Sequence, residues 1–382
     1  MSASVLAAGW RSVVVSLGDD VEVGRAIAYR TEKPMIVHVP LRVGDRSLSA
    51  YIHFGDSDRV SDLQVRPSLE EWTPPHYAPV DVTDTQLVLR TPRTGVGATL
   101  TVPSAPTPPP VAILLMGGGP FDRDGTVGGN RIGRDIALGL AGAGIASIRY
   151  DKPSFVDPQL REDPAFTPSL DYLHPVLSSI TEVRRRDDLD PSRIWLVGHS
   201  MGGRYAPRVA SEIEGIAGLV LLAADAAPMQ ESATRVARHL AAQSDAPRHA
   251  SAMVRRMERA AAVVNSDRLS LRTPRRKLPL NLSPGTWLEL RDDDPVAVAA
   301  RLTTPMLLLQ GGRDYQVTEH DDLSRWRAGL TGKPNVEFRV LPRDDHFFFP
   351  GDAPSTPAGY ESAQHVDPEA IRSTAAFIKA KR

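Results

Sequence analysis

The segment Gly-His-Ser-Met-Gly-Gly at residues 198–203 carries the clearest chemical signal in this 382-residue sequence. It matches the pattern G-x-S-x-G, follows the apolar run 194–197 and precedes a segment with helical spacing. In such a strand–turn–helix setting the serine occupies a strained turn, and its hydroxyl lies at the head of a helix, where amides favour negative charge. Ser200 is therefore a candidate nucleophile. The alternative interpretation is a tight glycine turn with a serine that faces solvent.

A serine hydroxyl attacks efficiently only when a histidine, oriented by a carboxylate, removes its proton. Around this type of turn the chain order is serine, then acid, then histidine. Asp314 follows the apolar run Met306–Gln310, and His346 follows the run Val336–Leu341. Each residue comes just beyond the end of a predicted strand, so we expect the three side chains to form a catalytic triad. Asp225, which follows an earlier strand, is the alternative acid.

Acyl transfer also needs hydrogen-bond donors for the oxygen that becomes negative in the transition state. The backbone N–H of Met201, directly after the serine, is the expected first donor. The second should come from the loop after an early buried strand, which here is the glycine-rich segment Met116–Pro120. A phosphate-binding interpretation of these glycines lacks the lysine and hydroxyl of a P-loop.

Short apolar runs that alternate with helical patterns must position these residues. Such runs are typical of strands buried on both faces, so they predict a mainly parallel α/β sheet with helices on both faces. The predicted strands are Val111–Met116, Ile145–Tyr150, Arg193–Val197, Gly218–Ala223, Met306–Gln310 and Val336–Leu341, with a strand pair at Gln86–Arg90 and Ala98–Val102. The predicted helices are Ile132–Ala143, Leu170–Arg186, Gly202–Ile213, Asp321–Leu330 and Pro368–Lys379.

The length of the chain suggests two domains. Three alternating runs, Met35–Pro40, Ser47–Phe54 and Arg59–Val65, predict strands of a small α+β domain. A proline-rich linker follows, so we expect this domain and linker at residues 1–80 and a catalytic domain at residues 81–382. No buried strand is predicted within residues 226–300. We expect this segment to form a helical cap insertion over the carboxyl ends of the strands.

The composition excludes several function classes. There is no cysteine, so thiol nucleophiles, disulfides and thiolate metal sites are ruled out, and no histidine motif suggests a metal. The net charge of −1 favours neither nucleic acid nor an anionic membrane as a partner. No apolar run has the length of a membrane span, and the first ten residues lack the basic region of a secretory signal. We therefore expect a cytoplasmic protein without cofactors.

Together these motifs resemble the α/β-hydrolase superfamily, and within it bacterial two-domain serine esterases of the dienelactone hydrolase-like or serine aminopeptidase-like branch. The resemblance covers roughly residues 84–380 and rests on five segments, whose order and spacing are more specific than any one of them. These are residues 117–125 (Gly-Gly-Gly-Pro-Phe-Asp-Arg-Asp-Gly), 149–152 (Arg-Tyr-Asp-Lys), 198–203, 311–318 (Gly-Gly-Arg-Asp-Tyr-Gln-Val-Thr) and 345–348 (Asp-His-Phe-Phe).

The resemblance implies roles for particular residues. Ser200 is the nucleophile, His346 the general base, Asp314 the acid that orients it, and Gly118 with Met201 the oxyanion hole. One residue departs from the family pattern: such loops commonly begin His-Gly, whereas Met116 stands here and cannot shape the loop by a side-chain hydrogen bond.

We therefore expect a serine hydrolase that cleaves a carboxylic ester of a small or medium organic acid through an acyl-enzyme. The alternatives are a biosynthetic acyltransferase, cyclase or thioesterase, a peptidase, and a non-catalytic binding protein on the same frame. The sequence leaves open the identity of the small-molecule ester or acyl substrate, and also the oligomeric state.

Overall fold

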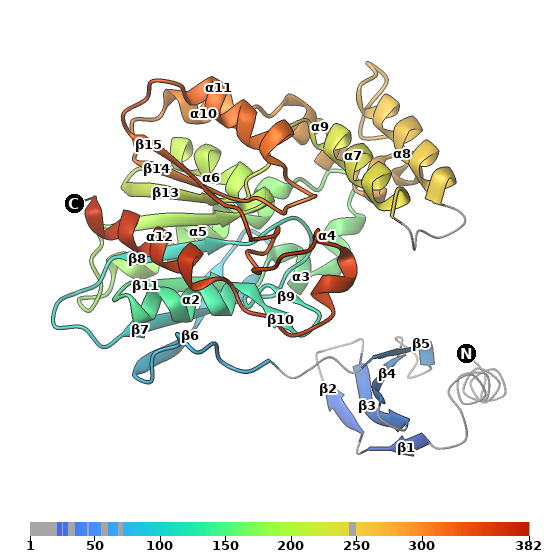
Figure 1. Cartoon of the computed structure of the whole chain (residues 1–382), viewed down its shortest axis with the longest axis horizontal. Coiled ribbons are helices and arrows are strands. Elements are labelled where there is room, and N and C mark those ends of the chain that lie inside the picture. Colours follow the sequence, from blue (N-terminus) through green and yellow to red (C-terminus); the bar gives the residue numbers. More distant parts are fainter. Residues whose placement is uncertain are drawn as a thin grey trace. The chain divides into compact units, whose positions relative to one another are not determined.

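The computed structural model describes residues 21–24, 26–29, 35–43, 46–54, 60–67, 72–243 and 250–381 (Figure 1). The chain divides into two compact units. The smaller comprises Met1–Trp72 with Tyr360–Ala363, and the larger comprises Thr73–Gly359 with Gln364–Arg382. The division therefore falls next to the proline-rich stretch of the sequence.

The described part of the smaller unit is an antiparallel sheet. Strands β3, β4 and β5 coincide with the three alternating runs of the sequence, and the buried side chains of Leu41, Leu48 and Ala50 form the core of the unit. The strands pair in the order β1-β3-β4-β5, and β2 also pairs with β3. Residues 1–20 lie outside the described residues. The bounds are β1 Val21–Val23, β2 Ile27–Tyr29, β3 Met35–Val43, β4 Arg46–Phe54 and β5 Val60–Pro67.

The larger unit is built on an eight-stranded sheet in the order β15-β14-β13-β12-β8-β11-β7-β6. Strand β7 runs antiparallel to both of its neighbours, and the six strands from β11 to β15 in that order are parallel. The mainly parallel sheet expected from the apolar runs is therefore confirmed. The bounds are β6 Val82–Arg90, β7 Gly95–Pro103, β8 Val111–Leu115, β11 Ala146–Tyr150, β12 Ile194–His199, β13 Ile216–Leu222, β14 Met306–Gly311 and β15 Val336–Leu341.

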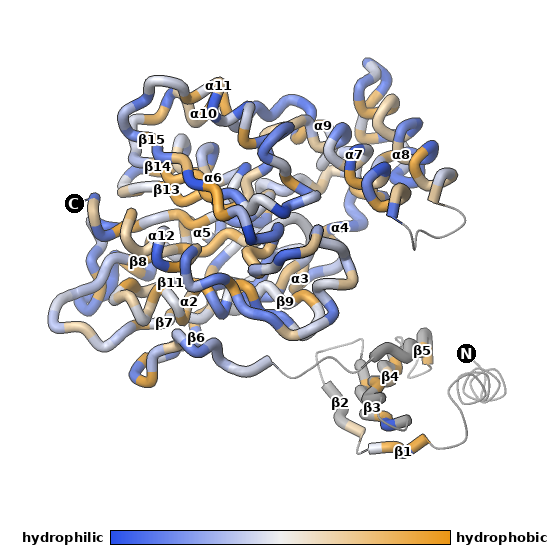
Figure 2. Tube along the Cα trace, viewed as in Figure 1, coloured by the Kyte–Doolittle hydropathy of each residue, from blue (hydrophilic) through white to orange (hydrophobic). Residues whose placement is uncertain are grey.

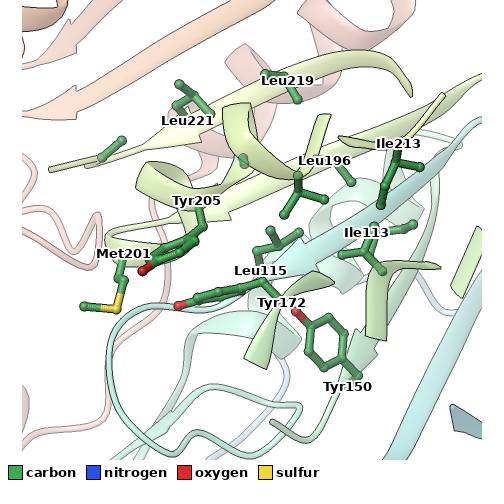
Figure 3. Packing of buried hydrophobic residues seen from close by; sticks show 14 of the residues in the cluster. Ile113, Leu115, Tyr150, Tyr172, Leu196, Met201, Tyr205, Ile213, Leu219 and Leu221 are labelled. Carbon is green, nitrogen blue, oxygen red and sulfur yellow. The ribbon is translucent and has the colours of Figure 1, made fainter. Parts of the chain in front are cut away.

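Helices cover both faces of this sheet (Figure 1). On one face α2 (Ile132–Gly142) packs against α12 (Pro368–Ala380), and the ring of Trp195 in β12 meets that of Phe377 in α12 at 5.7 Å. On the other face the next residue, Leu196, joins the cluster beneath α5 (Leu173–Arg184) and α6 (Met201–Glu212) (Figure 3). Successive side chains of each strand are thus buried on opposite faces, which explains the unbroken apolar runs in the sequence (Figure 2).

The expected helix Leu170–Arg186 is shorter in the structure. Pro168–Asp171 forms a single 3₁₀ turn, and Tyr172, with φ −120° and ψ −54°, separates it from α5. Three short helices also lie in this unit, outside the segment between β13 and β14. They are α3 Pro153–Val156, α4 Pro158–Glu162 and α11 Ser324–Leu330, and the unit also contains the two-residue strands β9 Thr126–Val127 and β10 Asn130–Arg131.

The segment between β13 and β14 is helical where it is described. It holds α7 (Met229–Ala241), α8 (Ala250–Val264), α9 (Pro284–Asp292) and α10 (Pro295–Arg301), and α7 packs along α8 (Figure 1). The buried guanidinium of Arg204 in α6 pairs with Asp225 at 3.2 Å and with Asp293 at 2.9 Å. One cation therefore links α6 to the start of this segment and to the turn between α9 and α10.

None of the helices in the described part of the chain has both the length and the apolar character needed to cross a membrane.

Candidate active site

Ser200 lies in the turn between β12 and α6, where the chain changes direction sharply. Its backbone has φ 54° and ψ −123°, values that cost a non-glycine residue of order 1–3 kcal/mol. The turn also needs close packing, because a Cβ on Gly202 would lie only 2.0 Å from the carbonyl oxygen of Leu115 in β8. The amide of Ser200 donates to the carbonyl of Leu222 in the neighbouring strand at 2.8 Å. The strained serine is therefore fixed at the carboxyl edge of the sheet.

Asp314 and His346 are joined by a hydrogen bond at the same edge. Because β14 and β15 are parallel neighbours, the loops after them begin side by side, and His346 Nδ1 lies 2.7 Å from Asp314 Oδ2. Both side chains are buried. The other carboxylate oxygen of Asp314 accepts the amides of Gln316 at 2.7 Å and Val317 at 2.9 Å. A carboxylate held in this way fixes the proton of His346 on Nδ1 and leaves Nε2 as the free acceptor.

Ser200 is connected to this pair through His199. The rings of His199 and His346 lie 4.9 Å apart, and His199 Nε2 donates to the backbone carbonyl of His346 at 2.8 Å. Among the described residues there is no hydrogen bond between the Ser200 hydroxyl and the His346 imidazole. Nucleophile–base hydrogen bonds are often loose in free enzymes and tighten when substrate binds.

The two neighbouring histidines differ in their electrostatics. Burial alone lowers the pKa of His346, but the charge of Asp314 and its hydrogen bond outweigh burial, so the pKa lies above its ordinary value. His199 has no carboxylate partner, and burial, together with the charge of His346, lowers its pKa to about 3. His346 is therefore the histidine that can hold a proton near neutral pH, whereas His199 stays neutral and structural.

The glycine-rich loop lies against Ser200. A Cβ on Gly117 would be 3.2 Å from Ser200 Cβ and 3.3 Å from His199 Nδ1, so a side chain there would crowd Ser200. A Cβ on Gly118 would be 3.3 Å from Met201 Cε, so the two expected oxyanion donors are neighbours. Met201 is the first residue of α6, and its N–H therefore has no partner within the helix. The Gly118 N–H likewise has no acceptor among the described residues.

The loop is held by Lys152, a residue that is 2% exposed. Its Nζ donates to the carbonyl of Gly117, to that of Gly119 at 3.2 Å, and to the hydroxyl of Tyr172 at 2.9 Å. Burial lowers the pKa of Lys152 to about 8, and the charge of Asp171 opposes this shift. The sequence analysis included Lys152 in the segment 149–152 but gave neither Lys152 nor Tyr172 a role. The available signal was a lysine two residues after a buried strand, in a chain with six lysines and 39 arginines.

Asp225, the alternative acid, is engaged elsewhere. One of its oxygens pairs with Arg204, and the residue is buried on the side of the sheet edge where the helical segment begins. It makes no hydrogen bond to His346 among the described residues. The structure therefore joins Asp314, and not Asp225, to the histidine.

A cavity of about 200 Å³ adjoins the glycine-rich loop. Its lining includes Gly119, Pro120, Lys152, Tyr172 and Met201, and also residues 280–283 with Thr286 from the segment between β13 and β14. A larger open hollow of about 770 Å³ lies beside α9 and α10 and contains none of the expected site residues. Within the described ranges no cluster of three or more His, Asp or Glu side chains could hold a metal ion.

The chain matches a known protein family. Residues 113–359 match the sequence profile of the Alpha/beta hydrolase family, which is more than half of the chain. The chain belongs to this family. The resemblance inferred from the five sequence segments is thereby confirmed, and the parallel sheet with its covering helices is the family's α/β-hydrolase fold.

The individual proteins that this chain is similar to share less than 30% of its residues. Esterase EstD of Thermotoga maritima is 29% identical over 377 residues, which is 97% of this chain and 85% of that protein. The structure is similar to a puromycin-hydrolysing peptidase of Mycobacterium tuberculosis (16% identity, TM-score 0.50), covering 96% of this chain and 49% of the peptidase. It is also similar to an esterase of Pyrococcus furiosus, with 15% identity, a TM-score of 0.49, and coverage of 82% of this chain and 98% of the esterase.

Proposed function

We propose that this hydrolase cleaves a carboxylic ester of a small or medium organic substrate through an acyl-enzyme on Ser200. The observation that carries the proposal is the buried hydrogen bond between His346 and Asp314 at the sheet edge that also bears the strained Ser200. The similarity to Esterase EstD supports an esterase-type hydrolase. The same chain order of serine, acid and histidine supports the triad.

In the first half-reaction the Ser200 oxygen attacks the carbonyl carbon of the ester while His346 Nε2 takes the hydroxyl proton. The C–O bond to the alcohol then breaks, and His346 returns this proton to the departing alkoxide. In the second half-reaction His346 removes a proton from water, and the hydroxide attacks the acyl carbon. The bond to Ser200 breaks, the serine regains a proton from His346, and the free acid leaves. Asp314 keeps its charge throughout and stabilises the imidazolium that forms twice.

The amides of Gly118 and Met201 would donate hydrogen bonds to the negatively charged oxygen of each tetrahedral intermediate. The proposal is supported by the closeness of Gly118 to Met201 and by the place of the Met201 amide at the positive end of the α6 dipole. Removal of one such donor typically lowers kcat by about 10²–10³-fold. This pair would therefore supply much of the expected rate acceleration.

The substrate would enter the cavity beside the oxyanion loop. Its volume of about 200 Å³ is below the range of roughly 300–1,000 Å³ typical of sites for drug-sized ligands, which favours a short acyl or alcohol group. Residues 280–283 contribute to this cavity. We therefore propose that residues 226–300, within a catalytic domain of residues 81–382, act as a cap that shapes the substrate site.

Hydrolysis of p-nitrophenyl acetate and p-nitrophenyl butyrate by the full chain tests the proposal. We expect turnover by the wild type, and a loss of at least about 10³-fold in kcat for Ser200→Ala, as in other triads. Ser211→Ala, which removes an exposed hydroxyl further along α6, is the matched control and should keep full activity. Equal activity of Ser200→Ala and the wild type would overturn the assignment. Cleavage of p-nitroanilides at the same rate as esters would favour a peptidase.

A further inference from the structure

The buried Lys152 binds the glycine-rich loop as a consequence of sheet register, and it is also among the residues that line the adjoining cavity. Strands β11 and β8 are parallel neighbours, with Ala146 opposite Val111 and Ile148 opposite Ile113, a constant separation of 35 residues. Two residues beyond the end of β11, the same separation places Lys152 opposite Gly117, whose carbonyl it binds. Burying a cation that is 2% exposed is costly, and here the hydrogen bonds to three oxygens and the nearby charge of Asp171 offset part of that cost.

The carbonyls that Lys152 binds determine where the loop amides point. In a planar trans peptide the C=O and N–H groups point in opposite directions. The carbonyl of Gly117 shares its peptide unit with the N–H of Gly118, so its bond to Lys152 directs that N–H away from the lysine. The carbonyl of Gly119 shares its unit with Pro120, which has no N–H, and this second bond only anchors the loop.

Tyr172 completes the arrangement. Its hydroxyl donates to the carbonyl of Met116 at 2.9 Å and accepts from Lys152 Nζ at 2.9 Å. The carbonyl of Met116 shares its peptide unit with the N–H of Gly117, so this N–H points away from the tyrosine hydroxyl. The ring is held in place by stacking on Tyr205 of α6, with centroids 5.0 Å apart (Figure 3). The Tyr205 hydroxyl in turn donates to Glu289 of α9 at 2.6 Å.

We infer that Lys152, together with Tyr172, is a positioning residue that holds the carbonyls of residues 116, 117 and 119 and so aims the Gly118 amide at the substrate oxyanion. The inference rests on the proposed acyl-enzyme chemistry. It also accounts for Met116: the loop needs no side-chain hydrogen bond from that position, because its backbone carbonyl is held by Tyr172. Removing the lysine should therefore affect the transition state much more than the binding of the substrate.

Kinetics of K152M and Y172F on p-nitrophenyl butyrate test the inference. We expect kcat to fall about 100-fold in K152M and about tenfold in Y172F, with KM within threefold of the wild type. Lys333→Met is the matched control for the lysine, because Lys333 Nζ also binds two carbonyls, those of Ala300 and Leu302, away from the site. Tyr150→Phe is the matched control for the tyrosine, because its buried hydroxyl donates to the carbonyl of Asp171. Both controls should keep kcat within twofold.

The dependence of kcat on pH shows whether Lys152 acts through its positive charge or only as part of the structure. The ionisable groups around Nζ are Asp171, Tyr172 and His199. Burial raises the pKa of Tyr172 well above its ordinary value and that of Asp171 above the usual carboxyl range, whereas the pKa of His199 is about 3. We expect the wild-type kcat to fall as the pH rises through about 8, where Lys152 loses its charge. Asp344, near His346, also has its pKa raised to about 8, mainly by burial.

K152R distinguishes these two groups, since its guanidinium stays charged throughout this range while Asp344 is unchanged. We expect K152R to recover part of the kcat lost in K152M and to lack the alkaline fall. An alkaline fall at the same pH in K152R would contradict the inference, and so would a kcat of K152M within twofold of Lys333→Met. Where circular dichroism shows that K152M is unfolded, Y172F against Tyr150→Phe decides, and equal kcat values overturn the inference. A wild type that hydrolyses no ester would instead refute the proposed function.

Discussion

The two walls of the candidate active site are held in place by different chemical groups. On the wall that carries Asp314 and His346, carboxylates accept backbone amides: Asp314 binds the amides of Gln316 and Val317, and Asp345 binds those of Phe347 and Phe349. On the wall formed by the glycine-rich loop, the ammonium of Lys152 and the hydroxyl of Tyr172 donate to backbone carbonyls.

The difference determines which backbone groups remain free to act on a substrate. On the first wall both kinds of backbone group are engaged, because Arg313 also donates to the carbonyls of Arg343 and Phe349, and in the proposed mechanism that wall supplies a side chain, His346, for proton transfer. On the opposite wall the anchors bind carbonyls, which leaves amides, the donors that an oxyanion needs, available to a substrate. In the proposed mechanism the two walls would thus divide proton transfer and oxyanion stabilisation between them.

The largest effect is expected on the carboxylate wall. Asp314→Asn should lower kcat by about 10⁴-fold, because the amide no longer holds the His346 proton on Nδ1 and Nε2 ceases to be the acceptor. The measurement is kcat on p-nitrophenyl butyrate, with circular dichroism to show that the fold is kept.

Asp225→Asn is the matched control for that substitution. Asp225 is also buried but pairs with Arg204, so its loss should lower the free energy of unfolding by about 2 kcal/mol while kcat stays within threefold. If Asp225→Asn lowered kcat as much as Asp314→Asn, the division of roles between the two acids would be wrong.

A smaller effect is expected on the amide wall. In Gly117→Ala the new Cβ would lie 3.2 Å from Ser200 Cβ and displace either the loop or the nucleophile. Because small misplacements at a reacting centre cost about 100-fold in rate, kcat should fall by that amount with little change in thermal stability. A variant that loses stability but keeps the wild-type kcat would show that this wall is structural only.

The smallest effect is expected at His199, which lies between the two walls. His346 must be neutral to accept the serine proton, and its pKa is raised, so kcat/KM should be lost as the pH falls through an apparent pKa above 6.5. His199→Gln should lower kcat/KM only about fivefold, the equivalent of about 1 kcal/mol, and should leave this acid limb in place. Disappearance of the limb in His199→Gln would transfer the role of base to His199.

Much of the fold could be predicted from the sequence, because strands buried on both faces leave continuous apolar runs. The run Val336–Leu341 has the same bounds as β15, and Met306–Gln310 differs from β14 by one residue. The hydrogen bond between Asp314 and His346 follows from the same pattern, since parallel neighbouring strands bring their carboxyl ends together. The triad and the oxyanion donors themselves stay predictions, which the experiments above test.

The anchors of the glycine-rich loop could not be predicted, because they depend on how distant segments pack. Lys152 contacts Gly117 only through the register of β11 on β8, which the sequence does not reveal. Tyr172 reaches the loop because the helical pattern from Leu170 is interrupted and α5 begins at Leu173. The spacing of apolar residues predicts one continuous helix in this segment. In the structure a 3₁₀ turn precedes Tyr172, and this turn determines where the Tyr172 side chain lies.

The central claim is that Ser200 is a nucleophile activated by His346. Labelling of the full chain with a fluorophosphonate, followed by mass mapping of the peptides, tests it most directly. We predict one adduct, on Ser200, in the wild type, and at least a 10³-fold slower rate of labelling in His346→Ala. An adduct on another residue, or unchanged labelling of Ser200 in His346→Ala, would contradict the account.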